Sequence, residues 1–144
     1  MSRASVSASS FMTRLGAQFY AESDGSVTAK VVMDSKHEGP PGYAHGGALA
    51  ALLDEAMGAA VWFSGVRVAA VHLNIDYKRA VALGVVARVS GRVERRDGRK
   101  VYASGAILLP DETVACTAHG IFVEAPQIFP EGGPGFIFSP VMDE

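Results

Sequence analysis

The sequence HGGALAALLDEAMGAAVWF, residues 45–63, decides how this chain can fold. From Gly46 to about Phe63 almost every residue is apolar or small, and the many alanines favour a helix. A helix that is hydrophobic on all sides has no face for solvent, so we expect it to be buried on most sides. Ser64-Gly65 is expected to end it.

Six other segments show the alternation of apolar and polar residues, and the flanking turns, that are typical of strands. They cover residues 19–21, 27–33, 71–78, 85–94, 101–109 and 113–123. Asp97-Gly98 predicts a hairpin between two of them. One long helix with five or six antiparallel strands predicts an α+β fold in which the sheet wraps around the helix.

Length and composition indicate one domain with a substantial core. The chain has 144 residues, of which 49% are hydrophobic and 19% charged, so wholesale disorder is excluded. We expect a flexible N-terminus at residues 1–12, a folded domain at 13–125 and an irregular tail at 126–144. The tail is rich in Pro, Gly and Phe. It either covers an apolar surface or is disordered.

Charge and cysteine content narrow the partners and the compartment. A net charge of −2 predicts no general attraction to nucleic acid or to a membrane, and the longest apolar stretch, residues 48–63, is interrupted by Asp54 and Glu55. The single Cys116 and the absence of a signal peptide lead us to expect a cytoplasmic protein. No metal or other cofactor is predicted, because the histidines lack ligand spacing. They are His37, His45, His72 and His119.

The predicted architecture leaves surfaces that a monomer would expose. An open sheet has unpaired edges, and the helix is too apolar to be covered on one side only. We therefore expect a homodimer. Whether dimers pair further into tetramers is left open by the sequence.

Two features near the helix carry candidate chemistry. Asp54 and Glu55 interrupt its apolar run, and an unpaired buried carboxylate is costly unless it has a role. The plain alternative is that one faces solvent and the other joins a structural hydrogen-bond network. His45-Gly46-Gly47 begins the helix, where free N–H groups can hold a carbonyl oxygen or an oxyanion. The plain alternative there is a residue that only starts the helix, with glycines that serve the turn.

The spacing of these features constrains how they can cooperate. His45 and Asp54 are nine residues apart, which places them on opposite sides of one helix with a rise of roughly 13 Å. They cannot act on the same atom within one subunit. If two such helices pack antiparallel across a two-fold axis, His45 of one subunit lies near Asp54 of the other, and two equivalent sites form.

Two motifs suggest a family. The segment HEGPPGYAHGG at residues 37–47, followed by Asp54, and the segment LNIDYKRA at residues 73–80 closely resemble the hot-dog acyl-CoA thioesterases of the phenylacetate-pathway type. The likeness runs from about Gly16 to Glu124. It implies a hot-dog fold, and it implies hydrolysis of an acyl-CoA to a free acid and coenzyme A.

The resemblance also implies roles. Asp54 matches the acidic residue that activates water or attacks the thioester, and the backbone N–H of Gly47 matches the donor to the thioester carbonyl. His45 matches the residue that orients the substrate. The other residues expected at the substrate are Gly46, His37, His72, Asn74 and, for coenzyme A phosphates, Lys78, Arg79 and the basic residues of 95–100. Nine of the thirteen Lys and Arg residues lie in 67–100, which suits an anionic ligand or simply a soluble surface.

One departure from the family pattern concerns the attacking water. Many relatives carry Ser or Thr four residues before the strand asparagine, and here that position is Ala70. His72, expected on the same strand face, is the candidate replacement unless it is an ordinary surface histidine. The departure keeps a non-catalytic acyl-CoA-binding protein as an alternative. A hot-dog hydratase or dehydratase is a weaker one, since its acidic residue precedes the histidine.

Overall fold

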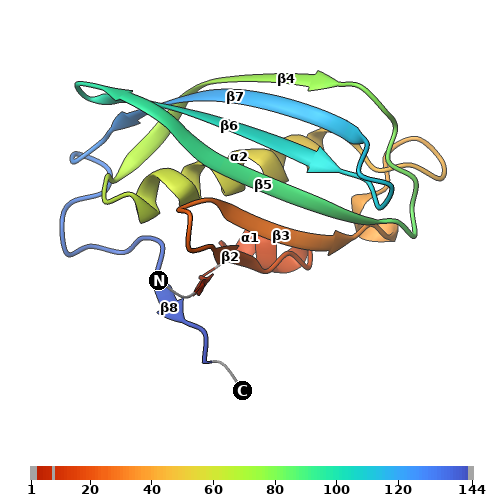
Figure 1. The fold of residues 1–144 in the computed structure, drawn as a ribbon, viewed down its shortest axis with the longest axis horizontal. Helices are drawn as coiled ribbons and strands as arrows, with labels where there is room; N and C mark the ends of the chain where they lie inside the picture. Colours follow the sequence, from red (N-terminus) through yellow and green to blue (C-terminus); the bar gives the residue numbers. More distant parts are fainter. Residues whose placement is uncertain (1–2, 8, 143–144) are drawn as a thin grey trace.

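The computed structural model describes residues 3–7 and 9–142, and all strands in these ranges belong to one antiparallel sheet (Figure 1). The strand order is β4-β7-β6-β5-β3-β2-β1-β8. The elements are β1 (Ala4–Val6), α1 (Ser10–Arg14), β2 (Phe19–Ala21), β3 (Val27–Val32), the 3-10 helix η1 (Ser35–His37), α2 (Gly46–Phe63), β4 (Val68–Tyr77), β5 (Val86–Asp97), β6 (Lys100–Leu108), β7 (Val114–Glu124) and β8 (Phe138–Pro140). The predicted helix and all six predicted strands are confirmed.

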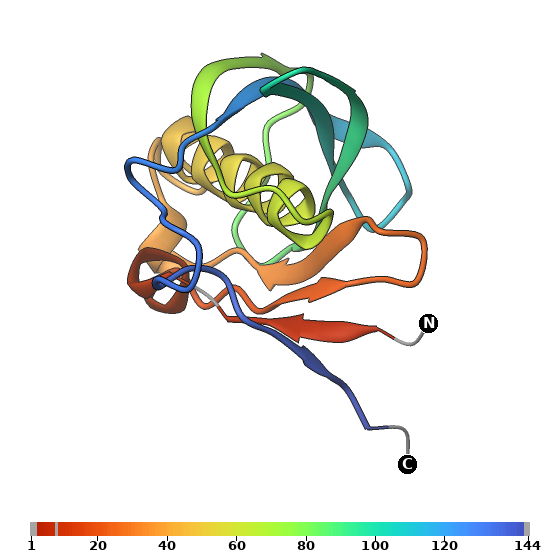
Figure 2. The ribbon, with the colours of Figure 1, turned by 90° about the vertical axis from the view of Figure 1, so that its left-hand side faces the viewer.

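Helix α2 lies in the hollow of the curved sheet, which curls around it when the molecule is viewed along the helix (Figure 2). The helix begins after His45 and ends at Ser64-Gly65, as the sequence predicts. Its buried residues face the inward-pointing residues of the strands, such as Val31, Ala87 and Val89. The core is therefore the space between one helix and the concave side of the sheet.

Gly91 lets helix and sheet approach each other closely. A Cβ atom at this position would lie 2.5 Å from the backbone carbon of Ala56 in α2. Strand β5 therefore needs glycine here, because any side chain would push the helix away from the sheet. A glycine inside an otherwise regular strand is the sequence signal for such a close approach.

Both ends of the chain contain elements that the sequence prediction lacked. The segment 1–12, expected to be flexible, contains β1 and the beginning of α1, and the tail 126–144, expected to be irregular, contains the short strand β8. Strand β1 pairs with β2 on one side and with β8 on the other, which joins the two ends of the chain in one sheet. Residues 1, 2, 8, 143 and 144 of the predicted segments lie outside the described residues.

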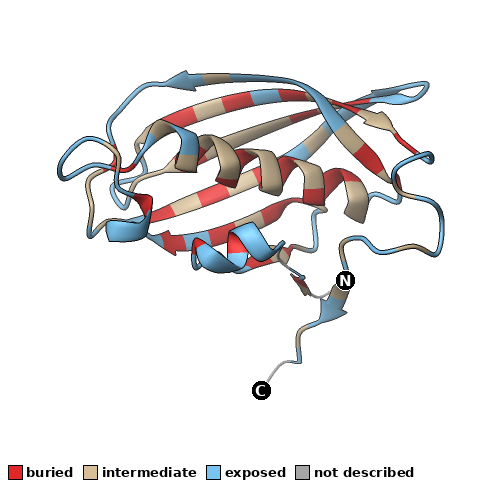
Figure 3. Cartoon of the chain, turned by 180° about the vertical axis from the view of Figure 1, so that it is seen from behind, coloured by how far each residue is buried: buried red, intermediate tan, exposed pale blue. Residues whose placement is uncertain are grey.

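One side of α2 is not covered by the sheet (Figure 3). This side carries the half-buried residues Asp54, Glu55, Gly58 and Trp62. The 18 residues of α2 are long and apolar enough to cross a membrane by length and composition alone, a property shared by core helices. Here the helix packs on β5, β6 and β4, which accounts for its apolar composition.

Candidate active site

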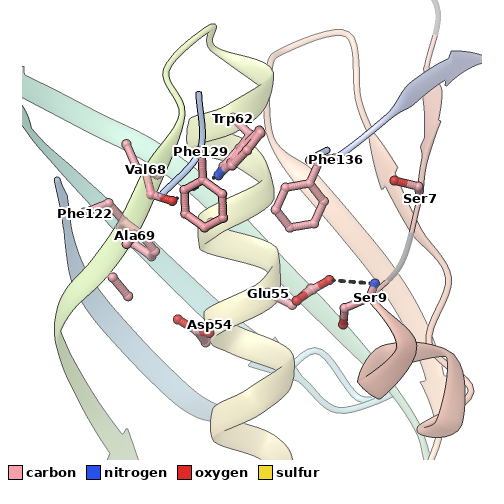
Figure 4. A pocket seen from close by; sticks show the side chains of 13 residues that line it. Ser7, Ser9, Asp54, Glu55, Trp62, Val68, Ala69, Phe122, Phe129 and Phe136 are labelled. Carbon is pink, nitrogen blue, oxygen red and sulfur yellow. Dashed lines mark hydrogen bonds between the residues drawn. The ribbon is translucent and has the colours of Figure 1, made fainter. Parts of the chain in front are cut away.

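A cavity of about 450 Å³ lies beside the uncovered side of α2 (Figure 4). Five parts of the chain line it and leave one side open: α2, the start of β4, β7, the N-terminal segment and the tail. Most of its lining is apolar. The lining residues are Ser7, Ser9, Asp54, Glu55, Gly58, Trp62, Val68, Ala69, Ala70, Phe122, Phe129, Gly135 and Phe136.

Asp54 brings a carboxylate to this cavity without a protein partner. Within the described residues, no hydrogen bond or ion pair to its carboxylate is present. Burial raises the pKa of the Asp54 carboxyl group above its ordinary value, because the charged form loses hydration there. A half-buried carboxylate with free lone pairs and a raised pKa can accept a proton from a water molecule in the cavity.

Glu55, the neighbouring carboxylate, has a structural contact. It points away from Asp54 toward the N-terminal segment, and its Oε2 accepts a hydrogen bond from the Ser9 N–H at 3.3 Å (Figure 4). Ser9 in turn caps the short helix α1 by accepting from the Met12 N–H. Burial also raises the pKa of Glu55. Of the two carboxylates in α2, Asp54 is therefore the one that is free to act.

His45 caps the other end of α2. Its Nδ1 accepts a hydrogen bond from the Gly47 N–H at 2.7 Å, which places the proton of the neutral imidazole on Nε2. The Gly47 N–H is therefore engaged by His45 in this conformation, and its role as donor to the thioester carbonyl stays a prediction. The Gly46 N–H has no acceptor among the described residues. In this conformation Gly46 offers the free amide at the helix start.

Tyr77 is a contact of this helix start that the sequence analysis missed. Its hydroxyl donates to the Gly46 carbonyl oxygen at 2.8 Å, and its ring lies beside the Gly46 Cα. Burial raises the pKa of the Tyr77 hydroxyl, so it stays protonated and keeps donating. The signal in the sequence was the alternation along β4, which places Tyr77 on the inward face at the end of the strand. There it pairs with the buried Cys116.

His37 does not reach the cavity. Its side chain is buried, its Nδ1 accepts from the Asp34 N–H at 3.1 Å, and its Nε2 lies 2.7 Å from the Leu15 carbonyl oxygen. The His37 carbonyl oxygen accepts from the His45 N–H at 2.6 Å. The predicted substrate contact is thus replaced by a role in holding His45 in place.

The Gly/Pro loop before α2 is also tied to His45. Two hydrogen bonds close its turn. The Gly39 N–H donates to the Tyr43 carbonyl oxygen at 3.0 Å, and the Gly42 N–H donates to the Glu38 carboxylate at 2.8 Å. A Cβ at Gly39 would lie 2.7 Å from the Cα of His45. Only glycine fits between the loop and the helix start, so Gly39 positions His45.

His72 faces the opposite side of the sheet from Ala70. Ala70 pairs with Phe122 and lines the cavity with Asp54, whereas His72 pairs with Ile121, because Val71 is an extra residue without a partner in this register. Such a bulge reverses the side-chain direction of the residues after it. The prediction that His72 replaces the missing hydroxyl is therefore wrong. Asn74 shares the outer face, in a shallow hollow with His119.

Lys78 and Arg79 lie at the end of β4, exposed, with both backbone N–H groups donating to the Ala115 carbonyl at 2.8 and 3.1 Å. Their side chains make no hydrogen bond or ion pair within the described residues. Arg95, by contrast, stacks its guanidinium 3.7 Å from the centre of the Tyr102 ring.

Cys116 is fully buried, and burial raises the pKa of its thiol to about 11, which suits a core residue.

Within one chain, the predicted catalytic residues remain apart. None of His45, Gly46 and Gly47 lines the cavity that holds Asp54, and eight residues of helix, about 12 Å, separate Gly46 from Asp54. This separation is the one that the sequence spacing predicts. A site that uses both ends therefore needs a second copy of the helix start.

The long central helix wrapped by an antiparallel sheet, with an apolar cavity beside it, defines a hot-dog protein with room for a small hydrophobic group. The chain belongs to the thioesterase superfamily, whose family model matches residues 41–116. This match confirms the family-level resemblance that the two motifs indicate.

Individual relatives agree with this assignment. The chain is 36% identical over 88 residues to the acyl-coenzyme A thioesterase THEM4 of Xenopus laevis, a match that covers 60% of this chain and 40% of that protein. A crystal structure described as a thioesterase superfamily protein is 34% identical, with a TM-score of 0.72, over 74% of this chain and 53% of that one. The E. coli PaaI protein, at 17% identity, shares the fold with a TM-score of 0.76 over 81% of this chain and 85% of its own. This chain spans about half or less of the length of the first of these relatives.

Proposed function

We propose that this chain is an acyl-CoA thioesterase that hydrolyses a thioester to a free acid and coenzyme A. The observation that carries the proposal is the unpartnered, half-buried Asp54 carboxylate in an apolar cavity. A thioester is already activated, so a carboxylate that takes a proton from water and one N–H donor at the carbonyl oxygen suffice. The name of the Xenopus relative supports the same substrate class.

The proposed reaction uses two subunits. A water oxygen forms a bond to the thioester carbon while its proton passes to Asp54. The negative charge that develops on the carbonyl oxygen is held by a backbone N–H at the partner subunit's helix start, and Gly46 is the donor that is free for this role. The tetrahedral intermediate then breaks its C–S bond, and the proton on Asp54 passes to the departing sulfur.

A homodimer would supply the second helix start. Strand β4 is an edge of the sheet, so one side of its backbone is unpaired, and it exposes Val71, Leu73 and Tyr77. Pairing of two β4 edges would cover these residues together with the uncovered side of α2. Light scattering after gel filtration should give twice the chain mass, and a stable monomer at micromolar concentration would contradict this part of the proposal.

The phosphates of coenzyme A would lie near the exposed Lys78 and Arg79. Neither side chain makes a hydrogen bond or ion pair within the described residues, and both residues directly follow Tyr77, which contacts the helix start. Replacing both with serine should raise KM for an acyl-CoA and leave kcat little changed. The raised KM should not appear with a substrate that carries only the pantetheine part.

The decisive experiment is a panel of acyl-CoA substrates with thiol release as the readout. On the best substrate, Asp54→Asn should lower kcat about 100- to 10,000-fold, the range for a lost general base. Glu55→Gln makes the same one-atom exchange at the next residue and should lose far less. Turnover by Asp54→Asn at the wild-type rate would refute the catalytic assignment.

A non-catalytic acyl-CoA-binding protein is the second candidate. It is favoured by Ala70, which brings a methyl group to the cavity where many family members have a hydroxyl, and by the engaged Gly47 amide. This alternative predicts tight binding of acyl-CoA with no thiol release from any substrate in the panel. The same panel with a binding measurement therefore separates the two candidates.

A further inference from the structure

The C-terminal residues 126–140, here called the strap, lie outside the segment that matches the thioesterase family and form one wall of the Asp54 cavity. Arg67 fastens the middle of the strap. One guanidinium nitrogen, Nη1, donates to the carbonyl oxygens of Pro130 and Gly133, both at 3.1 Å. The same guanidinium lies 5.0 Å from the centre of the Trp62 ring. The strap is thus held against the end of α2.

The far part of the strap is fastened to the N-terminal segment. Ser7 N–H donates to the Ile137 carbonyl at 2.8 Å, and Ile137 N–H donates to the Ser7 hydroxyl at 2.7 Å. Strand β8 then continues the sheet beside β1. Two separate anchors therefore fix the course of the strap across the cavity.

Between the anchors, the strap passes directly over Trp62. A Cβ at Gly135 would lie 2.2 Å from the Trp62 ring, so the strap backbone and the ring are in close contact. Phe129 and Phe136 meet Trp62 edge to face, with ring centres 5.2 and 5.5 Å away (Figure 4). These three rings line the end of the cavity that is farthest from Asp54.

The cavity has a definite length. Asp54, Gly58 and Trp62 follow each other at four-residue spacing on one side of α2, so the distance along the helix from the carboxylate to the aromatic end is about 12 Å. Gly58 between them adds no side chain to the wall. An extended hydrocarbon chain of roughly eight to ten carbons has this length, given C–C bonds of about 1.5 Å.

We propose that this cavity is the acyl pocket and that the strap sets its length, so that acyl groups of medium length are preferred. The inference rests on the proposed thioesterase function. The thioester carbonyl lies at Asp54, the hydrocarbon chain runs past Gly58, and its end meets Trp62, Phe129 and Phe136. Longer chains are rejected because the three rings block their path.

Phe129 is the residue whose removal tests this blockage. It lines the Asp54 cavity and also a second hollow of about 580 Å³ behind it, beside Arg67 and Glu131. Phe129→Ala joins the two spaces. Phe138 is the control from the same strap: its ring centre lies 5.0 Å from that of Phe63 and 6.3 Å from that of Phe136, but it does not itself line the cavity.

The experiment measures kcat/KM for saturated acyl-CoA substrates from two to sixteen carbons. The wild type should show a maximum near eight to ten carbons. Phe129→Ala should raise the ratio of the tetradecanoyl to the octanoyl value at least ten-fold, and Phe138→Ala should leave this ratio unchanged. If the wild type turns over none of these substrates, the proposed thioesterase function itself is wrong. A turnover maximum at two or at sixteen carbons, or an equal ratio in all three proteins, would overturn the pocket assignment alone.

A second readout does not depend on turnover. Trp62 is the only tryptophan of the chain, so its fluorescence reports directly on the closed end of the cavity. In Asp54→Asn, octanoyl-CoA should change the Trp62 emission, whereas acetyl-CoA and free coenzyme A should not. An identical change with all three ligands, or none with octanoyl-CoA, would show that the acyl chain does not reach the strap.

Discussion

The two ends of helix α2 are built in different ways. At its start, His45 is exposed, the Gly46 amide is free, and the supporting loop leaves this end open to solvent. From Asp54 to Trp62 the same helix is flanked by the strap, the N-terminal segment and β4, which line a cavity that is open on one side. One chain thus builds walls around one end and leaves the other end bare.

This difference indicates how the work of the site is divided. At the Asp54 end, this chain supplies walls that would receive the hydrocarbon and the carboxylate that would activate water, and the proposed dimer would cover the side of the cavity that stays open. The open end offers the Gly46 N–H as a donor. A ligand in the Asp54 cavity of the same chain cannot reach this N–H, because about 12 Å of helix separates Gly46 from Asp54. We infer that each subunit provides an acyl pocket for itself and a carbonyl donor for its neighbour.

The largest expected effect is the recovery of activity when two inactive variants, one changed at each end of α2, are mixed. Asp54→Ala and His45→Ala homodimers should each be nearly inactive. In a mixed dimer one site receives both changes and the other receives neither, so random exchange should restore roughly a quarter of the wild-type activity. The measurement is thiol release after subunit exchange, which differently tagged chains verify. Verified exchange without recovered activity would contradict the shared site.

Gly39→Ala tests the open end within one chain. The new Cβ would lie 2.7 Å from the Cα of His45 and must displace it, which should lower kcat/KM about ten- to a hundred-fold, because misplacement by about 1 Å is that costly. Pro41→Ala, in the exposed part of the same loop, is the control and should stay near the wild type. Circular dichroism checks that both variants fold. An Asp54-like loss in Pro41→Ala, or none in Gly39→Ala, would contradict the positioning role.

The sequence revealed the central elements because their signals are local. The apolar run of α2 and the period-two strands contain their own pattern, and the spacing of His45 and Asp54 already predicts that they remain apart in one chain. Strands β1 and β8 each have three residues, and they pair with each other across more than a hundred residues of chain. No local periodicity can identify such a pair.

The errors at the site have equally physical causes. The bulge at Val71 adds one residue without changing the composition of β4, so simple alternation placed His72 on the cavity side. Which amide at the helix start is free, that of Gly46 or that of Gly47, is a separate question that the sequence cannot answer, because it depends on the rotamer of the His45 ring. The composition of the tail left open whether it covers an apolar surface or is disordered, and the contacts of its aromatic rings with Trp62 required coordinates.

Arg67→Ala should loosen the covered end. The substitution removes two hydrogen bonds to strap carbonyls and the stacking on Trp62, which should lower the free energy of unfolding by about 1–2 kcal/mol. Amide hydrogen exchange should rise in the strap more than in β5–β7, whose ladders do not involve Arg67. Arg67→Lys keeps one nitrogen that can donate to carbonyls but lacks the planar guanidinium over Trp62, so it should lie between the two proteins. Unchanged exchange in the strap would mean that Arg67 does not fasten it.

The smallest effect concerns the pH dependence of stability, and it separates the covered Asp54 from an exposed carboxylate. Burial raises the pKa of Asp54 in the folded state, so the folded protein holds this proton more tightly than the unfolded chain. Asp54 therefore costs stability as pH rises above its unfolded pKa of about 4, and the cost is complete above the folded pKa. Asp54→Asn should gain stability over that interval, and the gain should vanish in acid.

Asp111 contributes to the pH dependence of stability with the opposite sign to Asp54. Hydrogen bonds from the Thr113 hydroxyl at 2.6 Å and the Thr113 N–H at 3.0 Å lower the pKa of its carboxyl group, so its ionised form stabilises the fold and this contribution is lost as pH falls. Asp111→Asn should therefore lose stability at neutral pH and match the wild type in acid. Urea unfolding between pH 3 and 8 measures both differences. If Asp54→Asn instead behaves like Asp111→Asn, the Asp54 carboxylate has a partner in the dimer, and it is then not free to take a proton from water.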